Sequence, residues 1–241
     1  MSMHYPNLTL LGCLILTYIV TGTTALADTE VPTSYSGIQG GRISLQANLE
    51  RKTTLAQRYK AGNPVAGQEK SQLCQGCHGE FGDSTDPFIP KLAGQRANYI
   101  TKQIRNYQEG MRTHEIMEAM AETINEDELA DIAAYFSHQT KMKGKGKTEN
   151  KRGKDLFVRS DTSKMMIACV NCHGEKGKGI ESPKSAFPVL GGQSKEYIRQ
   201  QLINFRSGDR RNSPYKIMNR IAESLTDIDI ESLADYVSVQ P

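Results

Sequence analysis

The chain has 241 residues, which is enough for one large domain or two small ones. Only 37% of the residues are hydrophobic, a low share for an ordinary globular enzyme, so the chain has little apolar material for a core. The net charge of +3 is mild and gives no electrostatic reason to expect a nucleic-acid partner.

The first 27 residues contain no Lys, Arg, Asp or Glu, and an apolar run from Leu8 to Val20 precedes Ala25-Leu26-Ala27. This pattern predicts a secretory signal peptide over residues 1–27 that is cleaved before Asp28. The apolar run is short for a membrane span. Because the stretch before it lacks Lys and Arg, an uncleaved membrane anchor remains the alternative.

Residues 28–60 have no counterpart later in the chain. The stretch 34–41 is rich in serine and glycine and is expected to be flexible. Residues 43–60 have leucines at weakly helical spacing and form either an extra docked helix or a tether.

A first domain is predicted over residues 61–139. A helix leads into the pentapeptide Cys74-Gln75-Gly76-Cys77-His78, and glycines and prolines then indicate a loop. Helical spacing of apolar residues resumes over 97–109. Asn125, followed three residues later by Glu128, predicts a capping box that opens the last helix of this domain.

Two cysteines three apart, with a histidine directly after the second, form the attachment signature of a c-type haem. Each thiol adds to one of two neighbouring vinyl groups on the porphyrin, so the two sulfur atoms must lie about one helical turn apart. The histidine is carried beneath the ring, where its Nε2 can bind the iron. The signature recurs as Cys169-Val170-Asn171-Cys172-His173, so the sequence predicts two covalently attached haem c groups. A haem would also supply the apolar bulk that the composition lacks.

The four cysteines could also bind zinc, act as redox pairs or form disulfides, but each of these alternatives accounts for fewer features of the sequence than haem attachment does. A structural zinc site usually has its Cys-x-x-Cys pairs about 15–20 residues apart, whereas 95 residues separate Cys74 from Cys169. Zinc also leaves the repeated histidine unexplained. A thioredoxin-like pair expects a βαβ pattern, which the sequence lacks. Plain disulfides in an oxidising compartment are a third alternative.

Residues 140–154 contain seven Lys or Arg and one acidic residue, interleaved with glycine. A charge run of this kind is usually solvated and mobile. We therefore predict a linker here, at the boundary between two domains.

The second domain, predicted over 155–241, repeats the first. Apart from a three-residue insertion, residues 92–137 align with 190–238, and Thr226 takes the place of the capping residue Asn125. No strand-like alternation of any length occurs, so the predicted fold class is all-α.

The second axial ligand of each iron separates a carrier from a catalyst, because an open face admits substrate, whereas a thioether closes it and raises the potential. After Cys172 the second domain contains one methionine, Met218, and no histidine beyond His173. Met218 is therefore the predicted ligand opposite His173, with a flexible core side chain as the alternative.

The first domain offers several methionines, and the internal repeat selects among them. Met117 aligns with Met218 and is the predicted ligand opposite His78. Met111 and Met120 align with other residue types, so we expect them at the surface and in the core.

Each ligating histidine needs an acceptor for its Nδ1–H. Pro90 and Pro188 match in the repeat, and their carbonyl groups are the predicted acceptors. Three further matched pairs are candidates for contacts to the haem propionates, with ordinary helix-surface packing as the alternative. These pairs are Gln95 and Gln193, Tyr99 and Tyr197, and Arg112 and Arg210.

The order of these motifs resembles the dihaem cytochrome c4 family over about residues 61–240. It runs from the haem motif through Pro-x-Leu-x-Gly-Gln and a methionine after a Gly-x-Arg loop to a closing Asp-Ile-Ala-Ala-Tyr-Phe at 131–136. The resemblance implies two class I cytochrome c domains related by a pseudo-twofold axis. It also implies a periplasmic electron carrier, often membrane-associated, that links quinol-oxidising complexes to terminal haem–copper oxidases. The extension at 28–60 and the very basic linker depart from the family pattern.

Two functions follow from this interpretation. The first is a monomeric electron-transfer protein with two His/Met haems, redox proteins as partners, loose association with the membrane surface at most, and no enzymatic activity. The second is the cytochrome subunit of a dehydrogenase, such as one that oxidises sulfur compounds. A dihaem peroxidase is disfavoured, because it needs one open haem face and both domains carry the same methionine.

Overall fold

The computed structural model describes residues 61–144, 150–160, 167–180 and 187–241. The chain divides into two compact units, residues 1–48 and 49–241, and every described residue belongs to the second. The predictions for the signal segment 1–27 and the extension 28–60 therefore lie outside the described residues. Within the described ranges, no helix has the length and apolar character needed to cross a membrane.

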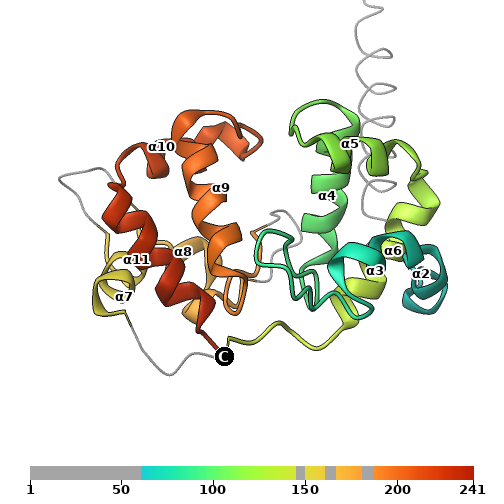
Figure 1. The fold of residues 1–241 in the computed structure, drawn as a ribbon, viewed down its shortest axis with the longest axis horizontal. Coiled ribbons are helices and arrows are strands. Elements are labelled where there is room, and N and C mark those ends of the chain that lie inside the picture. The colour runs from blue at the N-terminus through green and yellow to red at the C-terminus, as the bar shows by residue number, and fades with distance from the viewer. Residues whose placement is uncertain (1–60, 145–149, 161–166, 181–186) are drawn as a thin grey trace, which may run out of the picture. The chain divides into compact units, whose positions relative to one another are not determined.

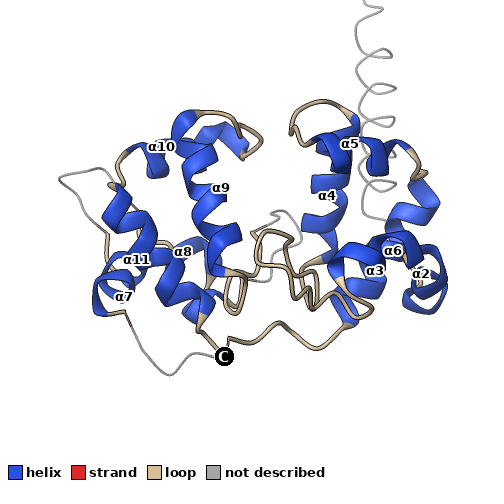
Figure 2. Cartoon of the chain, viewed as in Figure 1, coloured by secondary structure: helices blue, strands red, loops and turns tan. Residues whose placement is uncertain are grey.

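All regular structure in the described ranges is helical, and the helices form two successive sets (Figures 1 and 2). The first set comprises α2 (Pro64–Lys70), α3 (Gln72–His78), α4 (Ala97–Gln108), α5 (Glu115–Glu122) and α6 (Glu126–His138). The second comprises α7 (Lys151–Val158), α8 (Val170–His173), η2 (Glu175–Gly177), α9 (Lys195–Ser207), η3 (Pro214–Lys216), α10 (Ile217–Glu223) and α11 (Asp227–Ser238). The predicted all-α class is confirmed, and we call the two sets the first and second domains.

The last helix of each domain begins at the predicted capping residue. The Asn125 side chain accepts a hydrogen bond from the Glu128 N–H, and the Glu128 carboxylate accepts one from the Asn125 N–H at 3.1 Å. Thr226 and Asp229 form the same reciprocal pair at the start of α11. Both boxes satisfy N–H groups that would otherwise lack partners at a helix start.

In each domain the first helix crosses the last at a glycine. A Cβ added to Gly67 on α2 would lie 2.0 Å from the carbonyl oxygen of Asp131 on α6. A Cβ added to Gly153 on α7 would lie 1.9 Å from the carbonyl oxygen of Ser232 on α11. Only glycine lets the two backbones approach this closely.

Each domain has a cluster of buried apolar side chains. In the first domain it consists of Ile100, Ile132, Ala133, Tyr135 and Phe136. In the second it consists of Phe157, Ile198, Leu225, Ile230, Leu233, Ala234, Tyr236 and Val237. Each aromatic or branched aliphatic side chain buried in this way contributes about 1.5–3 kcal/mol.

The described residues of the predicted linker, 140–144 and 150–154, make specific contacts that a solvated charge run would lack. Met142 is only 2% exposed, and its N–H donates to the Ala93 carbonyl of the first domain at 3.1 Å. The Gly144 N–H donates to the Gln240 carbonyl of the second domain at 2.8 Å. Helix α7 starts at residue 151, before the predicted boundary at 155, because the Asn150 side chain caps it by accepting from the Gly153 N–H. The described part of the linker thus packs against both domains.

Candidate haem sites

Both cysteine motifs lie on helices that end at the histidine. The first occupies the C-terminal end of α3, and the second begins at Cys169, the N-cap of α8. Gly79 and Gly174 follow the histidines with φ of 85° and 74°, a region that glycine adopts readily, and the helices stop there. All four described cysteines are free. The helical backbone places the two thiols of each motif about one turn apart, as two vinyl groups require.

The two histidines are held in the same way. The ring of His78 is 7% exposed, and its Nδ1 lies 2.8 Å from the Pro90 carbonyl oxygen. The ring of His173 is also 7% exposed, and its Nδ1 lies 3.1 Å from the Pro188 carbonyl oxygen. A carbonyl acceptor fixes the tautomer with the proton on Nδ1 and leaves Nε2 with its lone pair free. This is the arrangement that a haem-ligating histidine needs.

Burial sets the protonation of these sites. It lowers the pKa of the His78 and His173 imidazoles, against the opposing effect of the proline carbonyls, and so favours the neutral ring that binds iron. It also raises the pKa of the Cys74 thiol, and that of Cys169 to about 11.

The predicted methionine ligands occupy equivalent places on short helices. Met117 lies in the first turn of α5 and Met218 in the first turn of α10, and both are half-buried. Met111, by contrast, is 53% exposed. The preceding residues, Ile116 and Ile217, are 63% and 40% exposed, although isoleucine is usually buried.

These features fit a flat apolar group in each domain. If a haem is attached to the cysteines of each motif, the histidine Nε2 and the methionine sulfur are the side-chain atoms that would serve as its iron ligands. A zinc site fits less well, because nowhere in the described residues do three His, Cys, Asp or Glu side chains gather around a common point.

The matched glutamines lie where the two domains meet. The Gln95 side chain donates to the Val189 carbonyl at 2.9 Å and accepts from the Val189 N–H at 2.8 Å. Gln193 makes the same two bonds to the backbone of Lys91, both at 2.9 Å. Each side chain is 4% exposed. The pair forms a near-symmetric bridge between the segments that follow Pro90 and Pro188.

The matched arginines and tyrosines also cross between the domains. The Arg112 guanidinium is 9% exposed and donates to the Tyr197 hydroxyl at 3.0 Å and to the Gln201 side chain at 3.1 Å. Arg210 mirrors it. Its partners are the Tyr99 hydroxyl at 3.1 Å and the side chains of Gln103 and Gln201 at 3.0 and 2.8 Å.

This cluster is cationic, and the partners given above for its arginines are neutral. Burial opposes charge on Arg112, whereas the nearby hydroxyl groups of Tyr197, Tyr107 and Tyr99 raise its pKa. Burial and then the two arginines lower the pKa of the neighbouring Lys102 to about 8. Buried cations of this kind favour an anion nearby. Carboxylates such as haem propionates are anions of this kind. Arg112 and Arg210 can therefore contact a propionate, as predicted, as well as the side chains of the other domain.

Four further residues belong to this cluster and were not predicted as site residues: Lys102, Gln103, Gln201 and Asn212. Gln103 and Gln201 accept from Arg210, Asn212 accepts from Arg210 through its side chain, and Lys102 donates to the Asn212 carbonyl. The repeat did align Gln103 with Gln201. A glutamine that recurs at the same helix position in both repeats is the signal that would have indicated a shared polar contact. Asn212 lies in the insertion and has no such signal.

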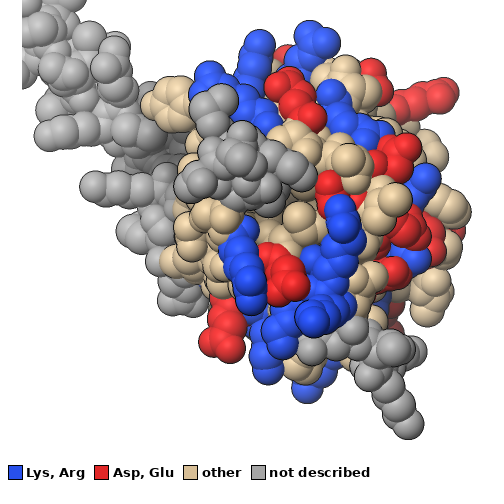
Figure 3. Space-filling model, turned by 90° about the vertical axis from the view of Figure 1, so that its left-hand side faces the viewer, with Lys and Arg blue, Asp and Glu red and all other residues tan. Residues whose placement is uncertain are grey.

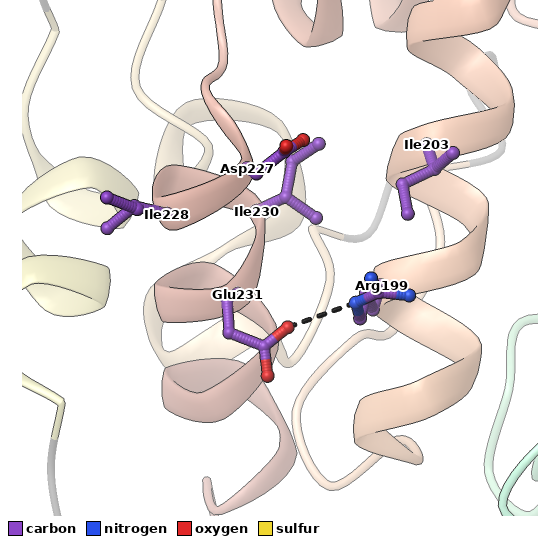
Figure 4. A pocket seen from close by; sticks show the side chains of 6 residues that line it. All are labelled: Arg199, Ile203, Asp227, Ile228, Ile230 and Glu231. Carbon is purple, nitrogen blue, oxygen red and sulfur yellow. Dashed lines mark hydrogen bonds and ion pairs between the residues drawn. The ribbon is translucent and has the colours of Figure 1, made fainter.

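A shallow hollow elsewhere on the second domain is separate from these sites. Arg199 and Ile203 of α9 line one wall, and Asp227, Ile228, Ile230 and Glu231 of α11 line the other (Figure 4). An ion pair of 3.1 Å joins Arg199 to Glu231 across it. It contains no cysteine, histidine or methionine, so it has none of the predicted ligands.

Known proteins match both domains. The family model for cytochrome c matches residues 64–140 and 150–240. Cytochrome c4 of Pseudomonas aeruginosa is 39% identical over 181 residues, which cover 74% of this chain and 89% of that protein. The thiosulfate dehydrogenase electron acceptor of Stutzerimonas stutzeri is 31% identical over 207 residues, covering 83% and 91%.

A solved structure matches as well. The crystal structure of reduced cytochrome c4 from Pseudomonas stutzeri superimposes with a TM-score of 0.70 at 36% identity, covering 75% of this chain and 100% of that one. The chain therefore belongs to the cytochrome c4 family of electron-transfer proteins, with two tandem cytochrome c domains and two covalently bound haem c groups.

Proposed function

We propose that this protein is a periplasmic carrier that takes electrons from a quinol-oxidising complex and delivers them to a terminal haem–copper oxidase. The proposal is supported by the recurrence of the same two candidate ligands in both domains. Each site has a buried histidine fixed by a proline carbonyl and a half-buried methionine at the same place in the repeat. A site with two protein ligands leaves no position for substrate, so neither domain is an enzyme active site.

The residues have distinct roles in this proposal. Cys74, Cys77, Cys169 and Cys172 form the thioether bonds, and His78, His173, Met117 and Met218 are the axial ligands. When bound, each haem supplies a reversible one-electron couple. The chain fixes the imidazoles through the Pro90 and Pro188 carbonyls and excludes water by burying the rings. Because both sites stay closed, little rearrangement accompanies electron transfer.

The same proposal assigns a role to each of the other segments of the chain. Residues 1–27 serve as a cleaved export signal, since the Cys-x-x-Cys-His haem attachment of bacteria takes place outside the cytoplasm. Residues 61–139 and 155–241 are the two electron-carrying domains, joined by the basic segment 140–154. The protein is monomeric and associates at most loosely with the membrane surface.

A second candidate is an electron acceptor for a sulfur-compound dehydrogenase. It is favoured by the similarity to a protein named as a thiosulfate dehydrogenase electron acceptor, which extends over 83% of this chain. The two candidates share the same sites and differ only in the protein that reduces the haems.

Stopped-flow mixing tests both candidates. Reduced holoprotein mixed with membranes that contain a haem–copper oxidase should be reoxidised in a cyanide-sensitive reaction, many times faster than by air alone. Oxidised holoprotein mixed with a thiosulfate dehydrogenase and thiosulfate should be reduced only if the second candidate is correct. Reoxidation that is no faster with membranes than without them would contradict delivery to an oxidase.

A further inference from the structure

The contact between the domains is nearly symmetric, but Lys102 of the first domain and its aligned residue Gln200 of the second make different contacts. Lys102 on α4 aligns with Gln200 on α9. The Gln200 side chain donates to Asn204 of its own helix at 2.6 Å. The Lys102 ammonium makes the matching bond to Asn106 at 2.7 Å and also reaches the Asn212 carbonyl of the second domain at 2.6 Å.

Asn212 is bound by the first domain through its side chain as well. Its Nδ2 donates to the side-chain oxygens of Gln103 at 3.0 Å and Asn106 at 2.8 Å, both on α4. Its Oδ1 accepts from Arg210 at 2.9 Å. Asn212 therefore has three hydrogen bonds to α4, counting the one from Lys102 to its carbonyl.

The segment 210–213 is in turn connected to Met218. The Ser213 hydroxyl accepts a hydrogen bond from the Met218 N–H at 3.1 Å. The next residue, Asn219, is 5% exposed and donates to the Arg210 carbonyl at 2.8 Å. The backbone around Met218 is thus tied to the segment that α4 of the first domain holds.

The methionine loop of the first domain lacks this support. The His114 N–H donates to the Glu118 carboxylate at 2.6 Å, and the Met117 N–H donates to His114 Nδ1 at a long 3.4 Å. Within the described ranges, the hydrogen bonds of residues 113–118 all stay inside the first domain. Arg112, just before this loop, does cross to the second domain.

We propose that Asn212 and Lys102 form a clamp through which the first domain holds the methionine loop of the second. The inference rests on the proposed ligation by Met218. The clamp makes Met218 harder to displace from its iron than Met117, because displacement requires the loop to move away. Lys102 and Asn212 are positioning residues, since they act on the ligand through the backbone of the loop.

Cyanide displacement in the oxidised holoprotein tests the clamp. The sulfur-to-iron charge-transfer band should disappear in two phases of equal amplitude, and the Met117→Ala variant should retain only the slower phase. In Asn212→Ala the slower phase should accelerate about tenfold, equivalent to about 1.4 kcal/mol. The faster phase should keep its wild-type rate. Lys102→Met should shift the slower phase in the same direction while leaving all side chains of the second domain intact.

Gln200→Met is the matched control, because the Gln200 side chain at the equivalent position donates to Asn204 of its own helix. It should leave both phases unchanged. An unchanged slower phase in both Asn212→Ala and Lys102→Met would overturn the clamp. If instead Met218→Ala leaves the charge-transfer band complete, the proposed ligation itself is wrong, so the two failures are distinguishable.

Discussion

At the scale of single residues, the two haem sites differ less in their histidines than in their methionines. The imidazoles of His78 and His173 are equally buried, and both have a proline carbonyl as partner for Nδ1. The backbone N–H of Met218 is bound by the Ser213 hydroxyl, whereas that of Met117 has a long bond to an imidazole. The backbone around Met117 is therefore held less tightly than that around Met218.

Replacing either predicted methionine should remove half of the sulfur-to-iron charge-transfer band. Met117→Ala and Met218→Ala each delete one thioether, and the band arises from that bond alone. Near-infrared absorption of the oxidised protein measures the effect. Met111→Ala is the control, because this exposed side chain should leave the band intact. Loss of half the band in the control would mean that the internal repeat selects the wrong methionine.

At the scale of helices, each domain depends on one glycine at a helix crossing. Gly153→Ala should lower the free energy of unfolding by about 1–3 kcal/mol, because the new methyl group would overlap the Ser232 carbonyl on α11. Denaturant unfolding followed by helical circular dichroism measures this. Gly76→Ala is the control, since a Cβ at that helical position meets no atom within 4 Å. Equal unfolding free energies for the two variants would contradict the close crossing.

The cap of α11 makes the second domain sensitive to acid. Burial disfavours the charge on Asp229, but hydrogen bonds from Thr226 and the Arg152 guanidinium outweigh it and lower the pKa of this carboxyl. A carboxyl whose pKa is lower in the folded state stabilises the protein above its unfolded pKa of about 3.9. That stability is lost as the pH falls through the folded-state pKa.

The Asp229→Asn variant should therefore be less stable than the wild type at pH 7, and the difference should shrink as the pH falls below the unfolded pKa of about 3.9 and through the lower folded-state pKa. Thermal unfolding between pH 2 and pH 7 measures it. Glu128→Gln, at the same capping position of α6, is the matched control without an arginine partner of this kind. A constant difference across the whole pH range would show that Asp229 acts through its shape alone.

The helices and their caps were predictable from the sequence because they depend on local signals. Asn125, Glu128 and Thr226 each act within one turn of the chain, and the haem motifs require only a helix that ends at a histidine. The start of α7 inside the predicted linker was not predictable, because the cap at Asn150 is surrounded by a charge run that indicates solvated chain.

At the scale of the whole chain, the contact between domains is the part that the sequence left open. The repeat aligned Gln95 with Gln193 and Arg112 with Arg210. However, the alignment of a symmetric pair is the same whether each residue contacts its own domain or the other domain. Asn212 lies in the insertion, so no alignment indicated its part in the contact. The two domains therefore differ more in the contacts of their methionine loops than the alignment of their sequences indicates.

Charge should make the two haems unequal in potential. Residues 61–138 carry six Lys or Arg and twelve Asp or Glu, a net charge of −6. Residues 155–241 carry twelve and eleven, a net charge of +1, and Figure 3 shows basic and acidic side chains interspersed on one face of the second domain. Negative charge favours ferric iron, so the haem of the first domain should have the lower potential.

One unit charge at roughly 10 Å, with an effective dielectric constant of about 20, shifts a couple by about 1.7 kcal/mol. Most charges lie farther away and are screened beyond about a Debye length. We expect a gap of about 59 mV or more, one tenfold step for a one-electron couple. Redox titration of Met117→His and Met218→His, each of which lowers one potential, assigns the values. A higher wild-type potential at the Met117 haem would contradict the electrostatic argument.

We propose that both haems are closed by two protein ligands, so that this chain acts as a carrier and not as a catalyst. Low-temperature electron paramagnetic resonance of the fully oxidised, full-length holoprotein tests it most directly, because the spin state reports the axial ligands. With two protein ligands on each iron, we expect two low-spin ferric signals of equal integrated intensity and no high-spin signal. A high-spin signal from one of the two irons would indicate an open haem face and would contradict ligation of both irons by two side chains.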